Sequence, residues 1–595
     1  MNMYYWKKPF LLLFELLLTL SIVRGQNTPA NDAFSKFEKV QHSKNKEIVR
    51  VGIPYVIRIN TQDDFSNLNK QIRGAIKQGK TNIEVLFSRG VFYYDKLSVY
   101  LYNINAESVS ISIKGDQTVL VAGGKDYKKN SKVLSPNRKN IYLDGQLDLI
   151  NLYGETNVSL GQVEVLDEKS KLCRIALATK ELFVPGMKVQ ISEWYRAPVY
   201  EVTDIKNGFV YFIASNLEYD KAKKCFNVHY DSVISKINPR VRLFNPAYLK
   251  NVTGAIHECE VSNFLTLYRV KLKSFSISGI EFCGSAKGEH ALCYFRDVKT
   301  EGIQISDCKF RYINQRIIRL KKTPNFTFEN NRIDSCFYGA VYSDIDCPNT
   351  IVKGNKFYRA EMGWTNSSCV VCCGEDFWVS NNQFEDIAYA SITSGYWSTK
   401  EGMMISRGLI EYNEFFFGND YYSHPEKYTL VDGGAIYLTT FSEDLVVRYN
   451  YFHNIRGVKS YRAIYCDDGA MNVTIYGNII CGFTDSHSIL SWRAKSLNKQ
   501  YAQTNDGINL FYNIIGGKYK MDERPNSSCV HGKNLIIYKE GEQVPERILS
   551  NFAYQEDDVY STGASIVNGR LKLSDAAMKE LKKFPTYSKM VRWIE

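Results

Sequence analysis

The sequence predicts an all-β protein, namely a right-handed parallel β-helix (solenoid) with an N-terminal capping helix and a small inserted β domain. The first observation is a repeat: from residue 275 onward, alternating apolar residues are followed by a polar residue, usually Asn, and two places later by a large apolar one. The second is its length of 23 to 37 residues, which fits one supersecondary unit per repeat. The third is composition: 41 Tyr, 32 Phe and only 14 Pro suit many short strands.

The closing apolar residue of each unit marks the repeat. These markers are Phe282, Phe310, Ile333, Phe357, Phe384, Phe415, Phe452, Ile480 and Ile515. Leucine-rich repeats would need leucine-spaced helices, and propeller blades would need four strands in about 40 residues, so neither architecture fits. Short coils wound as a parallel β-helix explain the spacing best.

An asparagine holds the same place in seven of these units. The seven are Asn331, Asn355, Asn382, Asn413, Asn450, Asn478 and Asn513. Asn tolerates a left-handed backbone, and its amide can bond to the same amide one repeat away. The sequence therefore predicts an asparagine ladder at a turn.

The first residues have the layout of a secretory signal peptide. Lys7 and Lys8 precede an apolar stretch that closes on small residues near Gly25. A transmembrane anchor is the alternative, but Glu15 interrupts the stretch, which is shorter than the ~20 residues of a spanning helix. We therefore expect an exported protein, secreted or periplasmic, with no membrane span after signal cleavage.

The rest of the chain divides by its patterns. The segment DDFSNLNKQIRGAIKQG places apolar residues on one helical face, which predicts a capping helix. The stretch around KVQISEWYRAPVYEVTDIKNGFVYFIAS breaks the repeat, and LSDAAMKELKKF (573 to 584) is typical of a helix. We expect a signal peptide at 1–25, an N-terminal linker at 26–49, the cap and first coils at 50–129, an inserted β domain at 130–250, the main β-helix at 251–530, and a C-terminal extension with a helix at 531–595.

Net charge and cysteine content limit the partners, disulfides and metal sites that we expect. The formal charge of +12 permits an acidic partner without demonstrating one. Most of the fourteen cysteines lie in strand-like patterns, so buried free thiols are favoured over disulfides. The cluster around Cys369, Cys372 and Cys373 lacks the second half of a structural zinc site, and we expect no metal.

Two consecutive coils align without a gap, which predicts a surface column. Leu438 and Cys466 each lie fourteen residues before a marker. Stacked coils are about 4.8 Å apart, so Thr439 should lie beneath Asp467, and the residue after it beneath Asp468. The preceding match, GAVYSDI, puts Asp344 in the same column, and looser alignments of SITSGYW and SILSWRA extend it. Its predicted members are Asp344, Tyr396, Thr439, Asp467, Asp468, Trp492 and Arg493, with Asp432 and His487 nearby.

Carboxylates, a guanidinium and aromatic rings on one face are typical of sites that bind and cleave sugars. One carboxyl group can protonate the leaving oxygen while another acts as nucleophile or activates water, and crowding of negative charge raises one pKa. The alternative is that strand-end aspartates cap backbone N–H groups. A turn needs one aspartate rather than the two at 467 and 468, which favours a functional pair.

The stretch DGGAIYLTT followed by YRAIYCDDGAMNVTIYGNII resembles the paired signature of bacterial β-helix enzymes of glycoside hydrolase family 141. The chain over roughly 50–125 and 250–530 likewise resembles the pectin-lyase-like β-helix superfamily. Members of family 141 act on plant cell-wall or related glycans. The resemblance implies Asp432 and Asp467 as the catalytic carboxylates. The family's Asp-Glu pair is Asp-Asp here, so Asp468 has a shorter reach.

Three functions follow as expectations. The first is a secreted glycoside hydrolase with catalytic Asp432, Asp467 and Asp468. Its expected sugar-binding residues are Asp344, Tyr396, His487, Trp492 and Arg493. The second is a polysaccharide lyase with a Lys or Arg base, in which Ca²⁺ or Arg neutralises a uronate. The third is a non-catalytic glycan binder, since fold does not fix function. A hydrolase would need no cofactor. We expect a monomer with a polysaccharide or glycan as partner, and no nucleic acid.

Overall fold

The computed structural model describes most of the repeat region and both caps. The described residues are 52–94, 97–122, 263–284, 291–311, 313, 315–336, 338–361, 368–395, 407–418, 433–439, 441–455, 461–467, 470–481, 487–491, 507–520, 530–539 and 558–595, together with short stretches between 141 and 258.

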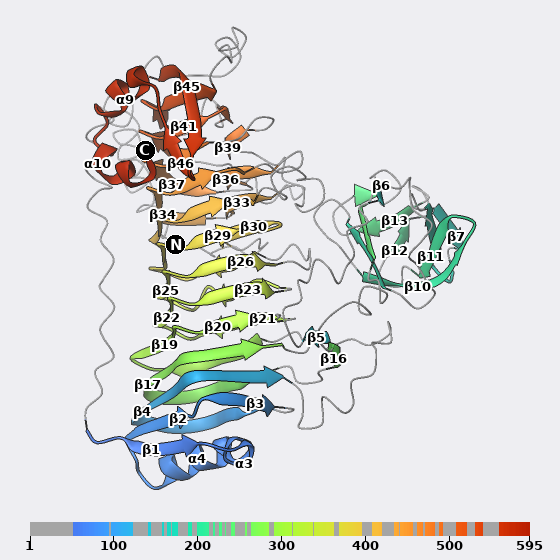
Figure 1. The fold of residues 1–595 in the computed structure, drawn as a ribbon, viewed down its shortest axis with the longest axis vertical. Coiled ribbons are helices and arrows are strands. Elements are labelled where there is room, and N and C mark those ends of the chain that lie inside the picture. Colours follow the sequence, from blue (N-terminus) through green and yellow to red (C-terminus); the bar gives the residue numbers. More distant parts are fainter. Residues whose placement is uncertain are drawn as a thin grey trace, which may run out of the picture.

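The chain is a right-handed parallel β-helix, which confirms the predicted fold class (Figure 1). Its 34-stranded sheet has three strands per coil, and from β18 to β41 each strand pairs in parallel with the strand three places further along the chain. We call the three faces A, B and C. They meet at three corners, and the chain runs A to B to C within every coil.

The faces are built from short strands. Face A holds β19 (Gly302–Ser306), β22 (Phe326–Glu329), β25 (Thr350–Lys353), β28 (Trp378–Ser380), β31 (Gly408–Glu411), β34 (Phe441–Arg448), β37 (Met471–Tyr476), β40 (Asn509–Phe511) and β43 (Val530–Gly532). Face B holds β20 (Lys309–Arg311), β23 (Arg332–Cys336), β26 (Lys356–Ala360), β29 (Gln383–Glu385), β32 (Glu414–Phe416), β35 (Tyr451–His453), β38 (Ile479–Ile480), β41 (Ile514–Gly516) and β44 (Leu535–Lys539). Face C holds β18 (Ala291–Lys299), β21 (Arg316–Lys321), β24 (Val341–Ser343), β27 (Val370–Cys372), β30 (Ala390–Ser394), β33 (Gly434–Leu438), β36 (Arg462–Cys466), β39 (His487–Ser491) and β42 (Lys518–Lys520).

The predicted marker residues fill the interior. Phe384 stacks on Phe415 at a ring-centroid distance of 5.0 Å, and Phe415 stacks on Phe452 at 4.6 Å. All nine markers are buried. The repeat exists because each coil contributes one large apolar side chain to this stack, and burial of such side chains is the main favourable term in folding.

The predicted asparagine ladder is present at the A-to-B corner. Asn450 donates from Nδ2 to Oδ1 of Asn478 at 3.0 Å, and its own Oδ1 accepts from Nδ2 of Asn413 at 3.0 Å. The ladder continues one coil beyond the predicted seven, to Asn534, which bonds to the carboxylate of Asp558. The buried amides therefore satisfy one another from coil to coil.

The left-handed backbone position lies one residue before the ladder. Asn330 has φ 55°, and the equivalent Tyr412 and Tyr449 have φ 55° and 56°. The ladder asparagines themselves do not have positive φ. The expectation that one asparagine supplies both the left-handed turn and the ladder amide is thus corrected: two adjacent residues share these tasks.

The N-terminal end is capped by two helices, α3 (Gln62–Ser66) and α4 (Leu68–Lys77). The buried residues are those of the predicted apolar face: Phe65, Leu68, Ile72, Ala75 and, partly, Ile76. Thr61 and Asp64 form a capping box at the start of α3. β1 (Tyr55–Ile59) precedes these helices and pairs in parallel with β2 (Asn82–Phe87), which is followed by β3 (Gly90–Tyr94).

The inserted domain lies in the sequence between two long strands, and these two strands pair with each other. β4 (Val99–Ala122) and β17 (Leu265–Cys283) run side by side in parallel through all three faces. Between them, seven strands form an antiparallel sheet outside the helix: β6 (Val158–Ser159), β15 (Arg240–Leu243), β9 (Lys188–Ser192), β10 (Val199–Lys206), β11 (Phe209–Ile213), β8 (Leu172–Ala176) and β7 (Glu164–Asp167). Smaller sheets pair β12 (Glu218–Asp220) with β13 (Cys225–Val228), β13 with β14 (Ser232–Val233), and β5 (Ile141–Leu143) with β16 (Ile256–Glu258).

The C-terminal segment packs on the outside of the last coils. It comprises β45 (Val559–Val567), β46 (Arg570–Lys572), α9 (Asp575–Leu581), α10 (Tyr587–Met590) and a 3₁₀ turn at Val591–Trp593. Trp593 stacks on Tyr451 of face B at 5.2 Å, and a second apolar cluster joins this segment to outward residues of face A, including Leu409 and Val446. The segment therefore covers faces A and B, at the upper left of Figure 1.

The cysteines within the described residues are free thiols. Eleven have defined side chains, and ten of these are buried. The predicted helix at 573–584 is present as α9, with Ser574 as its N-cap. No helix among the described residues is long and apolar enough to span a membrane.

Candidate active site

The register predicted for face C is confirmed around Asp467. Leu438 and Cys466 are partners in the pairing of β33 with β36. The backbone N–H of Asp467 donates to the carbonyl of Leu438 at 2.8 Å, and Thr439 occupies the same place one coil earlier. Asp467 thus ends β36 directly above Thr439.

The Asp467 carboxylate contacts a tyrosine hydroxyl. Tyr437, one coil earlier on face C, donates from its hydroxyl to Oδ2 of Asp467 at 2.5 Å. The turn after the strand is closed by the main chain, because Ala470 donates its N–H to the carbonyl of Asp467 at 2.9 Å. Asp467 is 6% exposed, so this hydrogen bond lies in partly dehydrated surroundings, where it is stronger than in water.

Aromatic rings surround this hydroxyl. Tyr437 packs edge to face against Tyr465, with centroids 5.2 Å apart, and against Tyr389 at 6.0 Å. The guanidinium of Arg462 lies 5.9 Å from the centroid of the Tyr465 ring. An acid, a cation and three phenol rings therefore meet at one place, a combination suited to hydroxyl-rich ligands with an apolar ring face.

A second carboxyl group lies inside the B-to-C corner of an earlier coil. Glu361 is fully buried and has φ 81°, a left-handed conformation that is uncommon for a residue with a long side chain. Burial raises the pKa of Tyr461, and the nearby Glu361 carboxylate raises it further. Strained backbone and a buried acid often accompany function, but they also occur in structural networks.

Asp344 shares the column with Asp467 but lies far from it. The pairings place Cys373, Gly395 and Thr439 between the two, so they are four coils apart, about 19 Å at the usual strand spacing. Oδ1 of Asp344 accepts from the N–H of Ile345 at 2.9 Å. Its described contact is thus that of a turn-capping aspartate.

The remaining predicted site residues are not all placed. Asp432, Asp468, Tyr396, Trp492 and Arg493 lie outside the described residues. His487 belongs to β39, where its backbone pairs with Lys518, and its side chain lies outside them as well. Their assignments stay predictions.

Sequence reasoning missed several residues beside Asp467. Tyr437 and Tyr465 were within reach, since the gapless alignment of AIYL with AIYC already superimposes them. Arg462 adjoins the same motif. Tyr389 and Glu361 follow irregular B-to-C connections whose lengths differ between coils, so no alignment could place them.

No group of three or more His, Cys, Asp or Glu side chains in the described part of the chain is arranged to hold a metal ion. The three clustered cysteines are in or next to β27, and burial raises the pKa of each thiol. All three are buried, and Cys369 and Cys372 belong to the apolar core.

Comparison with known proteins agrees with the architecture. The family model for a right-handed β-helix region matches residues 247–402. No curated protein matches the chain. The resemblance to family 141 therefore remains a prediction.

Several solved structures are similar in part. One is a glycoside hydrolase, with 8% identity and a TM-score of 0.42, covering 89% of this chain and 99% of that one. Another is XylC in complex with xylose, with 10% identity, a TM-score of 0.44 and coverage of 87% and 88%. A third is PfbA, a surface adhesin of Streptococcus pneumoniae, with 8% identity, a TM-score of 0.33 and coverage of 80% and 82%. At these values the similarities carry no argument about activity.

Proposed function

We propose that the protein is an exported glycoside hydrolase that cleaves a polysaccharide or related glycan on face C. The observation that supports this most is the carboxylate of Asp467, which ends a strand beside the phenols of Tyr437 and Tyr465. A turn aspartate would need neither a phenol partner nor an aromatic surround.

In this proposal, Asp467 is one of two carboxyl groups that act on the glycosidic bond. Asp432 is the second, and Asp468 is an auxiliary acid or an orienting group. The hydroxyl of Tyr437 holds the Asp467 carboxylate in one orientation, while the partly exposed ring of Tyr437 offers apolar surface to the C–H face of a sugar. Whether Asp467 is the acid or the nucleophile depends on the distance between the two carboxyl groups.

The test compares wild type with Asp467→Asn on a panel of plant, algal and host glycans, following reducing ends and ultraviolet absorbance together. We expect wild type to release reducing ends and the variant to lose at least about a hundredfold in rate, as removal of a general acid or base does.

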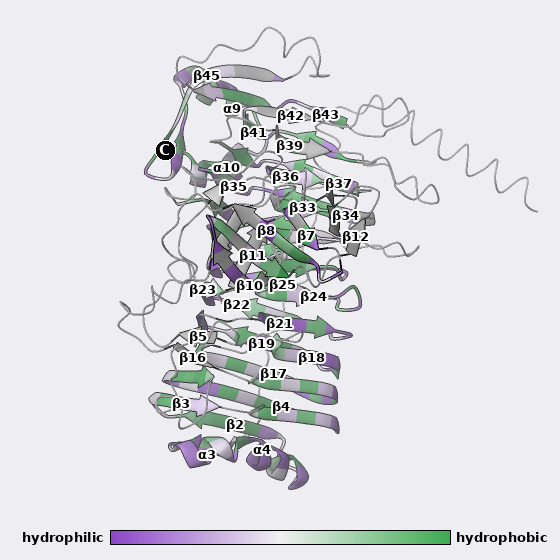
Figure 2. Cartoon of the chain, turned by 90° about the vertical axis from the view of Figure 1, so that its right-hand side faces the viewer, coloured by the Kyte–Doolittle hydropathy of each residue, from purple (hydrophilic) through white to green (hydrophobic). Residues whose placement is uncertain are grey.

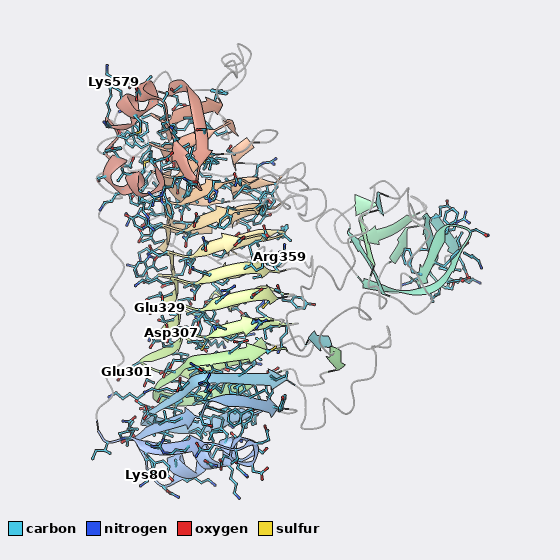
Figure 3. The ribbon with its side chains drawn as sticks, viewed as in Figure 1. Lys80, Glu301, Asp307, Glu329, Arg359 and Lys579 are labelled. Atoms are coloured by element: carbon cyan, nitrogen blue, oxygen red, sulfur yellow. The ribbon has the colours of Figure 1, made fainter. Side chains whose placement is uncertain are left out.

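The matched control is Asp307→Asn. Asp307 is also a turn aspartate, but it lies at the A-to-B corner, where its N–H donates to the carbonyl of Glu329 in the next coil (Figure 3). Its φ of 55° is one that Asn tolerates. Equal loss in both variants would contradict a special role for Asp467.

A lyase is the second candidate, because a specific observation favours it. Burial lowers the pKa of the Arg316 guanidinium to about 10, nearer to the range in which it can accept a proton. Arg316 lies on face C with its guanidinium 4.8 Å from the ring centroid of Tyr342. Ultraviolet-absorbing products that persist in Asp467→Asn and vanish in Arg316→Gln would select the lyase. Silence of wild type on the whole panel would favour the glycan binder.

A further inference from the structure

The N-terminal coils of face C carry a row of tyrosine and arginine side chains. We define the tyrosine–arginine strip by six residues: Tyr100, Tyr102, Tyr268, Arg296, Arg319 and Tyr342. They come from β4, β17, β18, β21 and β24, which are stacked in that order in Figure 2. None of the six is buried, and Tyr100 and Tyr102 are 36% and 37% exposed.

The strip is ordered by the strand register. Tyr102 pairs with Tyr268, and Tyr268 pairs with Arg296, so these three form one column at the coil spacing. Arg319 pairs with Tyr342 in the neighbouring column. Side chains two residues apart on one strand point to the same side, so both columns face outward together.

The rings and guanidinium groups of the strip contact one another. Tyr100 and Tyr102 stack with centroids 6.0 Å apart and planes 9° apart, and Tyr102 meets Tyr268 at 5.3 Å. The guanidinium of Arg296 lies 5.0 Å from the Tyr268 centroid. These contacts hold long side chains in place on the surface, which reduces the entropy lost when a ligand binds.

The strip is also strongly basic. The strand segments 99–105, 265–271, 291–299, 316–321 and 341–343 hold seven Lys or Arg residues and one acid, Asp297, and the neighbouring Glu107 pairs with Lys271 at 2.9 Å. Asp297 lies 3.7 Å from Nε of Arg296, a loose surface pair that contributes little. Seven cations against the two acids Asp297 and Glu107 attract a polyanion, and arginine's fork of donors suits carboxylate and sulfate groups.

The strip is continuous with the column that ends at Asp467. From Tyr268 the register passes through Arg296, Lys321 and Asp344, and reaches Asp467 after seven coils, about 34 Å at the usual strand spacing. Between them, the outward side chains that continue the Tyr342 column on face C are Val371, Thr393 and Tyr437. An extended chain lying along the helix axis would therefore meet both.

We propose that the tyrosine–arginine strip is a binding site for an extended acidic polysaccharide, whose rings lie on the tyrosines and whose carboxylate or sulfate groups pair with Arg296 and Arg319. This deepens the proposed function by naming an acidic glycan as the ligand. The aromatic rows also fit single-stranded nucleic acid, but continuity with Asp467 favours a glycan.

The test measures binding rather than turnover, in the full-length Asp467→Asn protein. The probes are polygalacturonate against its methyl ester, and dextran sulfate against dextran, so that each anion has a neutral counterpart. We expect tighter binding of at least one anionic member, weakened by added NaCl. The polygalacturonate and dextran sulfate arms distinguish carboxylate from sulfate as the preferred group.

Variants locate the site. Arg296→Gln and Tyr268→Ala should each raise Kd about tenfold, while Tyr268→Phe should keep binding because the ring stays. The matched control is Arg332→Gln on face B, an exposed arginine with a similarly loose acidic neighbour, Asp334, at 3.9 Å. It should leave Kd unchanged.

Four results would overturn the proposal: equal binding of charged and neutral probes, unchanged Kd in both strip variants, an equal loss in Arg332→Gln, or tighter binding of an oligothymidylate than of either acidic polysaccharide. Each is independent of whether the wild-type protein hydrolyses any glycan. Hydrolysis of a glycan without binding at the tyrosine–arginine strip would support the proposed function alone. Binding at the strip without hydrolysis would support the strip proposal alone.

Discussion

At the scale of single residues, Asp467 and Tyr437 are the pair on which the proposed chemistry depends. The carboxylate is nearly buried, and it accepts a hydrogen bond from a neutral hydroxyl of the neighbouring coil. A neutral donor orients a carboxylate without cancelling its charge, which leaves it able to act as an acid, a base or a nucleophile.

Replacing Tyr437 with Phe tests this orientation. Loss of a hydrogen bond to a charged group should lower kcat about tenfold, with KM little changed because the ring remains. Steady-state kinetics on the glycan that wild type cleaves would measure it. Tyr358→Phe on face B is the control, and a similar loss there, or none in Tyr437→Phe, would contradict the assignment.

How far the sequence predicts this site depends on coil length. The coils containing Thr439 and Asp467 have equal lengths, so a gapless alignment stacks them correctly. Asp344 was placed in the right column, but the number of coils between it and Asp467 could not be counted across connections of unequal length. Glu361 shows no pattern at all, because burial of a lone acid depends on tertiary packing.

At the scale of elements, the asparagine ladder ends on an acid. Asp558 accepts from the N–H of Asn534 at 2.8 Å and from the hydroxyl of Tyr519 at 2.5 Å. Burial raises the pKa of Asp558, and these hydrogen bonds offset only part of the rise. The ladder therefore ends on a group whose charge is costly in the folded state.

The pH dependence of stability follows from this shift. The pKa of Asp558 is raised in the folded state. Its contribution to the free energy of unfolding is therefore fully present below the ordinary pKa of 3.8, and it is lost as the pH rises through the folded pKa. We expect Asp558→Asn, which extends the ladder, to be more stable than wild type at pH 7 and to lose that advantage at pH 3. Urea unfolding at both pH values measures it.

The control for this prediction is Asp376→Asn, which removes an exposed ion pair with Arg407. It should change the free energy of unfolding by less than about 1 kcal/mol. An Asp558→Asn variant that is less stable than wild type at pH 7 would show that the carboxylate's second oxygen matters more than its charge.

The ladder was predictable because it repeats, whereas its details were not. The amide contacts of Asn413 and Asn450 follow from spacing alone. The left-handed residue before each amide was missed, since it is Asn330 in one coil and Tyr412 in another. Several residue types can adopt this backbone conformation, so no single residue type marks the position in the sequence.

At the scale of the whole molecule, the outer faces are used differently. The C-terminal segment covers faces A and B of the last coils, and Trp593 donates from Nε1 to the carbonyl of Tyr449 at 3.1 Å. Face C carries both the candidate active site and the tyrosine–arginine strip. A single elongated face thus holds all of the proposed glycan contacts.

The interior makes a prediction about thiol chemistry. Burial raises the pKa of Cys308 and Cys336 to about 12, so little reactive thiolate forms. In the native protein we expect at most four of the fourteen cysteines to react with a thiol reagent at pH 8, since ten are buried. All fourteen should react in urea, and a reductant should leave Tm unchanged. More than four reactive native thiols, or a fall in Tm with reductant, would contradict this.

The side-by-side pairing of β4 with β17 across the inserted domain has a consequence for how the chain finds its structure. Coils after Leu265 join near neighbours in sequence, while β4 must meet β17 across some ~140 intervening residues. The entropy of closing a loop grows only with the logarithm of its length, so this gap costs about 2 kcal/mol more than a ten-residue connection. The insertion is therefore tolerated at equilibrium, but long-range closure is slow. We expect the helix to assemble from its later coils, with the N-terminal cap docking last.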